Sequence, residues 1–123
     1  MGFALNGTAA AALMLIAATP AAAASFDCTR AATPDEKAIC SSPALSDLDT
    51  EMATLFGVRM EIPMLMGARG AGRDEQHDWL VARHACGGDT ACLTQSYRQR
   101  VAELQQTIAE AMQDYCRRLG ICG

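Results

Sequence analysis

Six cysteines are the side chains whose type and spacing most directly imply chemistry in this sequence. They are Cys28, Cys40, Cys86, Cys92, Cys116 and Cys122. Thiols form disulfides in an oxidising compartment, or bind a metal ion as thiolates. The even number favours a disulfide framework, and the lack of any CxxC pair counts against a metal site. We therefore expect three disulfides and no metal centre, provided that the chain is exported.

The beginning of the sequence predicts export. Residues 1–24 carry no charged side chain, and the apolar stretch 9–18 has the length of a signal-peptide core, too short to cross a bilayer. The three alanines at 22–24 are the small residues that a signal peptidase requires before the cleavage point. We expect a signal peptide that is cleaved before Ser25. The single mature domain, 25–123, would be periplasmic or secreted, with no membrane attachment after processing.

The charge balance narrows the class of partner. The chain has 14 acidic and 10 basic residues, a net charge of −4, and all of them follow the leader. A negative surface disfavours nucleic acid and anionic membranes as partners. It is compatible with a basic protein, so we expect a protein partner.

No group of residues predicts a catalytic site. His77 and His84 are seven residues apart and would share one helix face, but no serine or cysteine nucleophile is free to join them. Asp47, Asp49 and Glu51 are closely spaced carboxylates. We interpret these three as the solvated face and favourable N-terminal charges of a helix. The sequence therefore predicts a binding protein rather than an enzyme, with no cofactor.

A copper site is the alternative for the methionines and histidines in the middle of the chain. Met60, Met64 and Met66, with His77 and His84, are ligand types that copper accepts. Methionine is also an adaptable filler of apolar cores at helix ends. We interpret these residues as packing residues and keep metal handling as the last of three functional hypotheses.

Helices are the elements expected to position these residues. No segment alternates apolar and polar residues for long enough to predict a strand. Thr33 before Pro34, Ser42 before Pro43, and Asp89 are helix-start signals. The expected helices cover about residues 34–40, 43–62, 73–85 and 90–119. The predicted fold class is all-α: a small disulfide-stapled helical bundle, in which a short N-terminal helix precedes three longer helices that run up, down and up.

Residues 63–72 are predicted to form a loop between the second and third of the expected helices. Three of them are glycines: Gly67, Gly70 and Gly72. Loops on a rigid scaffold commonly carry binding residues. The candidate partner-binding residues in this loop are Met64, Met66 and Arg69.

Apolar spacing predicts which helix faces are buried. Trp79 and Leu80 should lie on the inner face of the third helix. Arg83 should be stacked on the tryptophan or salt-bridged beside it, rather than form an interface anchor with it. The last helix has an apolar seam formed by Leu93, Tyr97, Val101, Leu104, Ile108, Met112, Tyr115 and Leu119. Beyond Ile108 this helix should extend past its neighbours. The first helix or a second copy of the chain would then cover its end, so a dimer is possible.

Helix geometry limits the disulfide pairing. Cys92 and Cys116 lie roughly 36 Å apart along one helix, so they cannot bridge each other. In an up-down-up bundle the first four cysteines share one end, where Cys28–Cys40 and Cys86–Cys92 are the preferred pairs and crossed pairs remain open. Cys116–Cys122 is the expected third bridge, although either thiol could instead link two chains.

The order of particular residues resembles the LprI-like lysozyme-inhibitor family. The resembling residues are Ser25-Phe26-Asp27-Cys28, Ala31, Thr33, Glu36, Lys37, Ile39, Cys40, Leu45, Leu48-Asp49, Gln76, Trp79-Leu80, Arg83, Cys86, Cys92-Leu93, Tyr97, Arg100 and Leu104. The resemblance implies a small, exported, cysteine-bridged helical domain with lysozyme inhibition as its activity. The chain departs from the family pattern at Phe56-Gly57 and in its additional Cys116/Cys122 pair.

Three functional hypotheses follow. The first is a secreted or periplasmic inhibitor that occludes the active site of a lysozyme-type cell-wall glycosidase. The second is an envelope-associated interaction module without inhibitory activity. The third is a metal-handling periplasmic protein.

Overall fold

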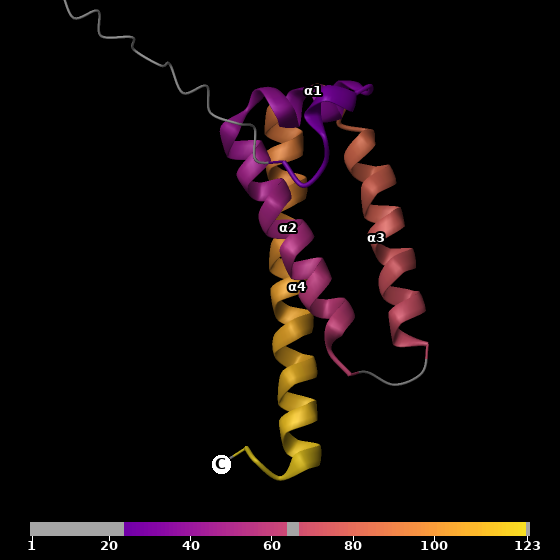
Figure 1. The fold of residues 1–123 in the computed structure, drawn as a ribbon, viewed down its shortest axis with the longest axis vertical. Helices are drawn as coiled ribbons and strands as arrows, with labels where there is room; N and C mark the ends of the chain where they lie inside the picture. Colours follow the sequence, from indigo (N-terminus) through magenta and orange to yellow (C-terminus); the bar gives the residue numbers. More distant parts are fainter. Residues whose placement is uncertain (1–23, 64–66, 123) are drawn as a thin grey trace, which may run out of the picture.

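The computed structural model describes residues 24–63 and 67–122, and within them the predicted all-α fold is confirmed. A short 3-10 helix, η1 (Cys28–Arg30), precedes the α-helices α1 (Pro34–Ser41), α2 (Pro43–Glu61), α3 (Ala68–His84) and α4 (Thr90–Leu119). Figure 1 shows α1 lying across one end of the molecule, while α2, α3 and α4 alternate in direction. The expected leader, 1–24, lies outside the described residues except for Ala24.

Side-chain caps fix the starts of three helices where the sequence predicts them. Thr33 and Glu36 form a complete capping box at α1, in which the Thr33 backbone N–H donates to Glu36 Oε2 at 3.0 Å. Ser42 accepts from the Leu45 backbone N–H at α2, and Asp89 accepts from two backbone N–H groups at α4. These caps satisfy backbone groups locally, so they can be recognised without knowledge of the tertiary structure.

The start of α3 differs from the prediction. Helix α3 begins at Ala68 rather than near Arg73, so Arg69 is an exposed residue of its first turn and not a loop residue. Gly72 is helical and lies against α2, where a Cβ atom would come within 2.5 Å of Arg59 Nη1. This glycine therefore serves close helix packing rather than a flexible connection. Met64 and Met66 lie outside the described residues.

The hydrophobic core is centred on the contact between α2 and α4, the most extensive in the fold. Its buried members are Ile39, Leu45, Met52, Leu93, Tyr97, Val101 and Leu104. Trp79 of α3 is partly buried and packs edge-to-face on Tyr97, with 5.2 Å between the ring centroids. The prediction that Leu80 faces inward is wrong, because α3 turns Gln76 and Arg83 towards the interior and leaves Leu80 37% exposed.

Three disulfides link neighbouring segments. Cys28–Cys40 ties the N-terminal segment to α1, Cys86–Cys92 closes the turn between α3 and α4, and Cys116–Cys122 folds the C-terminal tail back on α4. These are the local pairs that helix geometry favours.

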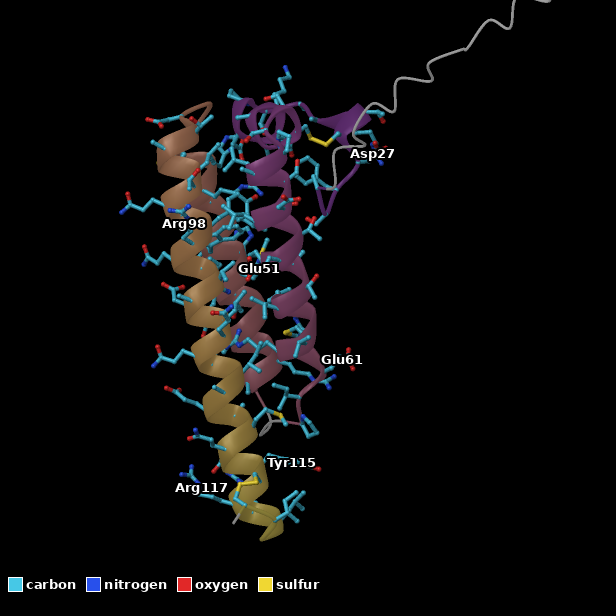
Figure 2. All side chains as sticks on the ribbon, turned by 90° about the vertical axis from the view of Figure 1, so that its left-hand side faces the viewer. Asp27, Glu51, Glu61, Arg98, Tyr115 and Arg117 are labelled. Atoms are coloured by element: carbon cyan, nitrogen blue, oxygen red, sulfur yellow. A yellow bond between two sulfur atoms is a disulfide. The ribbon has the colours of Figure 1, made fainter. Side chains whose placement is uncertain are left out.

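The C-terminal part of α4 extends beyond the other helices, as Figure 2 shows at Tyr115 and Arg117. We call residues 108–122 the overhang. Its apolar side chains Met112, Tyr115, Leu119 and Ile121 are exposed, as expected for a helix that outlasts its neighbours. Helix α1 lies at the opposite end and does not cover them (Figure 1). That a dimer forms here stays a prediction.

Candidate functional site

An open groove lies between α2 and α3. Its volume is about 720 Å³. Ser25 and Phe26 of the N-terminal segment before η1 contribute to its lining, and this segment runs past the upper part of α2 towards α3 (Figure 1). The apolar lining consists of Phe26, Met52, Ala53, Phe56, Leu80 and Val81. We call this feature the α2–α3 groove.

The polar side of the groove is held by an ion pair between α1 and α3. Arg83 donates from Nη2 and Nε to Asp35 Oδ2 at 2.9 and 3.1 Å. His84 Nδ1 lies 3.0 Å from the other oxygen of the same carboxylate. Asp35 is completely buried. The two hydrogen bonds from Arg83 therefore compensate the free energy that it costs to remove the carboxylate from water.

A second buried carboxylate joins α2 to α4 and to the N-terminal segment. Tyr97 donates its hydroxyl proton to Asp49 Oδ1 at 2.7 Å, and the Ser25 backbone N–H donates to Asp49 Oδ2 at 2.6 Å. Arg83 Nη1 donates to the Tyr97 hydroxyl oxygen at 3.1 Å and lies 4.0 Å from Asp49 Oδ1. One connected network therefore spans α1, α2, α3 and α4. We call Asp35, Asp49, Arg83 and Tyr97 the buried polar network.

The network changes the acidity of two of its members. Burial raises the pKa of the Asp35 carboxyl, but hydrogen bonds from Thr33 and His84 and the charge of Arg83 outweigh burial, so the pKa falls below its usual value of 3.8. Burial raises the pKa of Tyr97 well above its usual value, and the hydrogen bond to Asp49 adds to the rise. At neutral pH the network thus holds an ionised Asp35 and a protonated tyrosine.

Gln76 fixes the middle of α3 against α2 and α4. Its side-chain oxygen accepts from Arg100 Nη2 at 3.0 Å and from Nε at 3.2 Å, while its amide nitrogen donates to Met52 Sδ at 3.1 Å.

Arg83 also lies over the Trp79 ring, with its guanidinium carbon 5.8 Å from the centroid. Arg83 is thus salt-bridged beside the tryptophan, as the sequence predicts.

Several predicted residues occupy other places. Asp49 is buried, so its assignment to a solvated helix face is wrong; Asp47 and Glu51 are exposed as expected. The candidate loop residue Arg69 is at the start of α3, away from the residues that line the groove. His77 and His84 both line the groove, but His84 contacts Asp35 rather than His77.

The sequence signals for Asp35 and Asp49 were ambiguous. Asp35 lies in the first turn of α1, where exposed carboxylates are common, and Asp49 lies between the exposed carboxylates Asp47 and Glu51 of α2. Their burial follows from partners 48 residues away, Arg83 for Asp35 and Tyr97 for Asp49. An arginine and a tyrosine on inward-facing helix positions each require a polar partner, which is the signal that points to buried acids.

No group of three or more histidine, cysteine, aspartate or glutamate residues in the described part of the chain is arranged to hold a metal ion. Among the helices in that part of the chain, none is both long enough and apolar enough to cross a membrane.

The comparisons with known proteins identify one set of relatives. The chain is 30% identical over 90 residues to Lipoprotein LprI of Mycobacterium bovis and of Mycobacterium tuberculosis. The aligned region covers 70% of this chain and 43% of each relative, so the chain spans less than half the length of the proteins it matches. No family model matches the sequence. No solved structure matches it. The similarity supports an LprI-like relationship for the greater part of the chain.

Proposed function

We propose that the mature domain is an extracytoplasmic binding protein that inhibits a lysozyme-type cell-wall glycosidase by occluding its active site. The resemblance to the LprI-like lysozyme-inhibitor family supports the inhibitor class, and the similarity to Lipoprotein LprI agrees with that resemblance. The three disulfides support an oxidising location, in the periplasm or outside the cell. An inhibitor of this kind carries out no chemistry of its own and needs no cofactor.

The observation that carries the proposal is the α2–α3 groove. Arg83 binds Asp35 directly and lies 4.0 Å from Asp49, so these polar residues hold the walls in place rather than serve a reaction. Its apolar wall includes Leu80 and Val81, which remain exposed on α3. A rigid concave surface with exposed apolar side chains is typical of a protein-docking site.

Inhibition by such a surface requires only steric occlusion or a change of charge in the enzyme's cleft. Lysozymes act through two carboxyl groups, one of which must stay protonated to act as the general acid. A partner that seals the cleft or changes its hydration prevents this step. The net charge of −4 would speed association with a basic enzyme at low ionic strength.

A second candidate is an interaction module with no inhibitory activity. The same groove would serve either function, and the chain covers 43% of its relatives, so an activity of the whole relative need not reside in this part. Binding without inhibition distinguishes this candidate from the first.

The test is a turbidity assay of cell-wall lysis by chicken-type and goose-type lysozymes, with and without the oxidised mature protein. We expect inhibition of at least one type. Val81→Glu should weaken it at least tenfold, because Val81 is 60% exposed in the groove. The matched control Val58→Glu, at a valine that is 46% exposed on α2 and does not line the groove, should inhibit normally.

The predicted loop residues supply a further arm of the same assay. If Met64→Ala and Met66→Ala weaken inhibition while Val81→Glu does not, the contact surface lies at the α2–α3 connection and the groove assignment is wrong. If the protein binds a lysozyme that still lyses cell walls at its normal rate, the result supports the interaction module instead. No affinity for either enzyme type contradicts lysozyme as the partner.

A further inference from the structure

The buried polar network carries an imbalance of charge. Asp35 and Asp49 are both at most 1% exposed, and the guanidinium of Arg83 lies close to only one of them. Its shortest contact with Asp35 is 2.9 Å, whereas the contact with Asp49 is 4.0 Å. His84, the other potential cation, also lies against Asp35. Asp49 is therefore a buried carboxylate to which, among the described residues, two neutral groups donate at short range, the Tyr97 hydroxyl and the Ser25 backbone N–H.

A buried carboxylate without a close cation is costly, so the second of these donors matters. The nitrogen that lies 2.6 Å from Asp49 Oδ2 belongs to Ser25. Ser25 is also the residue at which the sequence predicts that the mature chain begins. In the precursor this nitrogen is a neutral amide.

Removal of the leader changes the charge of that atom. A signal-peptidase-type hydrolase adds one water across the Ala24–Ser25 peptide bond, which leaves a carboxylate on Ala24 and an amino group on Ser25. An α-amino group has a usual pKa of about 7.7–8.0, so it is mostly protonated at neutral pH. Cleavage would then place a positive charge on the nitrogen that already contacts Asp49.

We propose that Asp49 is the binding site for the amino terminus of the mature protein. Leader removal converts the hydrogen bond from Ser25 to Asp49 into an ion pair, and the network then holds two carboxylates and two cations, Arg83 and the Ser25 ammonium. Charge-assisted hydrogen bonds are stronger than neutral ones. Maturation therefore anchors the N-terminal segment, whose residues Ser25 and Phe26 contribute to the lining of the α2–α3 groove. This inference goes beyond the proposed function and does not depend on lysozyme as the partner.

The direct test compares the stability of two oxidised proteins, one beginning at Ser25 and one that retains Ala24 as its first residue. The additional residue moves the ammonium about 3.8 Å along the chain. We expect the equilibrium constant for unfolding in urea to be at least tenfold smaller for the protein that begins at Ser25. Ala24 packs against the core, so packing alone would favour the longer protein, and the expected sign can come only from the charge.

Asp49→Asn supplies the decisive arm of this experiment. In that variant the two N-termini should give unfolding constants within about twofold of each other, since the carboxylate that distinguishes them is gone. The matched control Asp47→Asn, at an exposed aspartate on the same helix, should preserve the tenfold difference. A tenfold difference that persists in Asp49→Asn, or no difference in the parent protein, overturns the proposal.

A second measurement covers the case in which Asp49→Asn does not fold. The α-amino group of the native protein that begins at Ser25 should react at least tenfold more slowly with an acylating reagent near pH 8 than the α-amino group of the protein that begins at Ala24. In urea both should react at the same rate. Equal reactivity in the native state overturns the proposal. N-terminal sequencing of the exported protein that finds a first residue other than Ser25 also overturns it.

Discussion

Helix α4 passes through two different environments, and the comparison of its two halves shows what gives this small domain its stability. Tyr97 in the first half is fully buried and donates to Asp49, whereas Tyr115, on the same apolar seam, is 38% exposed. Arg100 is buried against Gln76, whereas Arg118 is exposed and pairs with Asp114 on the same helix. The same residue types thus make tertiary contacts where α2 and α3 pack against the helix and only local contacts beyond them (Figure 2).

The difference implies that one end of the molecule forms a cooperative unit and the overhang does not. The α1 end contains two disulfides, the buried polar network and the hydrophobic core. The overhang contains one disulfide and ion pairs between exposed side chains, which contribute little in water. Matched substitutions at the two ends should therefore differ in effect.

The largest difference is expected between two arginines. Arg83→Ala should lower the free energy of unfolding by about 3–5 kcal/mol, because it leaves the Asp35 carboxylate buried without its guanidinium partner. Arg118→Ala should change it by less than about 0.5 kcal/mol. Urea unfolding followed by circular dichroism measures both. Equal effects would mean that the network contributes no more than a surface ion pair.

The second comparison uses two disulfides with the same sequence separation of 6 residues. Cys86→Ser should lower the free energy of unfolding by about 2–3 kcal/mol and leave a reactive thiol at Cys92. Cys116→Ser should cost less than about 1 kcal/mol, because the segment that its disulfide closes lies on the overhang. Thermal unfolding and thiol titration test this pair. A larger loss for Cys116→Ser would contradict the proposed difference between the ends.

The third comparison concerns two helical glycines. Gly72→Ala should destabilise the protein by about 1–3 kcal/mol, because its Cβ would meet Nη1 of Arg59, a buried side chain that Glu75 holds at 3.0 Å. Gly57→Ala, where no atom lies within 4 Å of the added carbon, should be neutral or stabilising by up to about 1 kcal/mol. Melting temperatures of the two variants decide the matter. A harmless Gly72→Ala would show that α3 does not approach Arg59 as closely as described.

The smallest expected effect is the change in folding stability as the pH falls into the acid range. The folded-state pKa of Asp35 is lowered below 3.8, so its contribution to stability is present at higher pH and is lost as the pH falls through that lowered value. Asp35→Asn should therefore flatten the decline of stability in the acid range. Urea unfolding at a series of pH values tests this. An identical acid decline in Asp35→Asn and the parent protein would contradict the assignment.

Local signals account for what the sequence could predict of this fold. Thr33-Pro34, Ser42-Pro43, Asp89 and Gly120 mark helix ends through contacts within a few residues. The disulfide pairs follow for the same reason, because each joins cysteines that are close in sequence.

The features that sequence reasoning missed all depend on distant partners. Gly72 was interpreted as a loop residue because the side chain that requires it, Arg59, lies on another helix. Asp49 was placed in solvent because Tyr97 is 48 residues away. The α2–α3 groove was not foreseen, since it depends on the rotation of α3 that exposes Leu80 and directs Arg83 inward.

The central claim is that the rigid α1 end presents the binding groove and that the overhang does not take part. Backbone hydrogen exchange of the oxidised protein, measured with and without a saturating inhibited lysozyme, tests it most directly. We expect residues 77–84 of α3, which include Leu80 and Val81, to exchange more slowly when lysozyme is bound. We expect no change over residues 108–119 of α4. Added protection confined to the overhang, or none in α3, would contradict the claim.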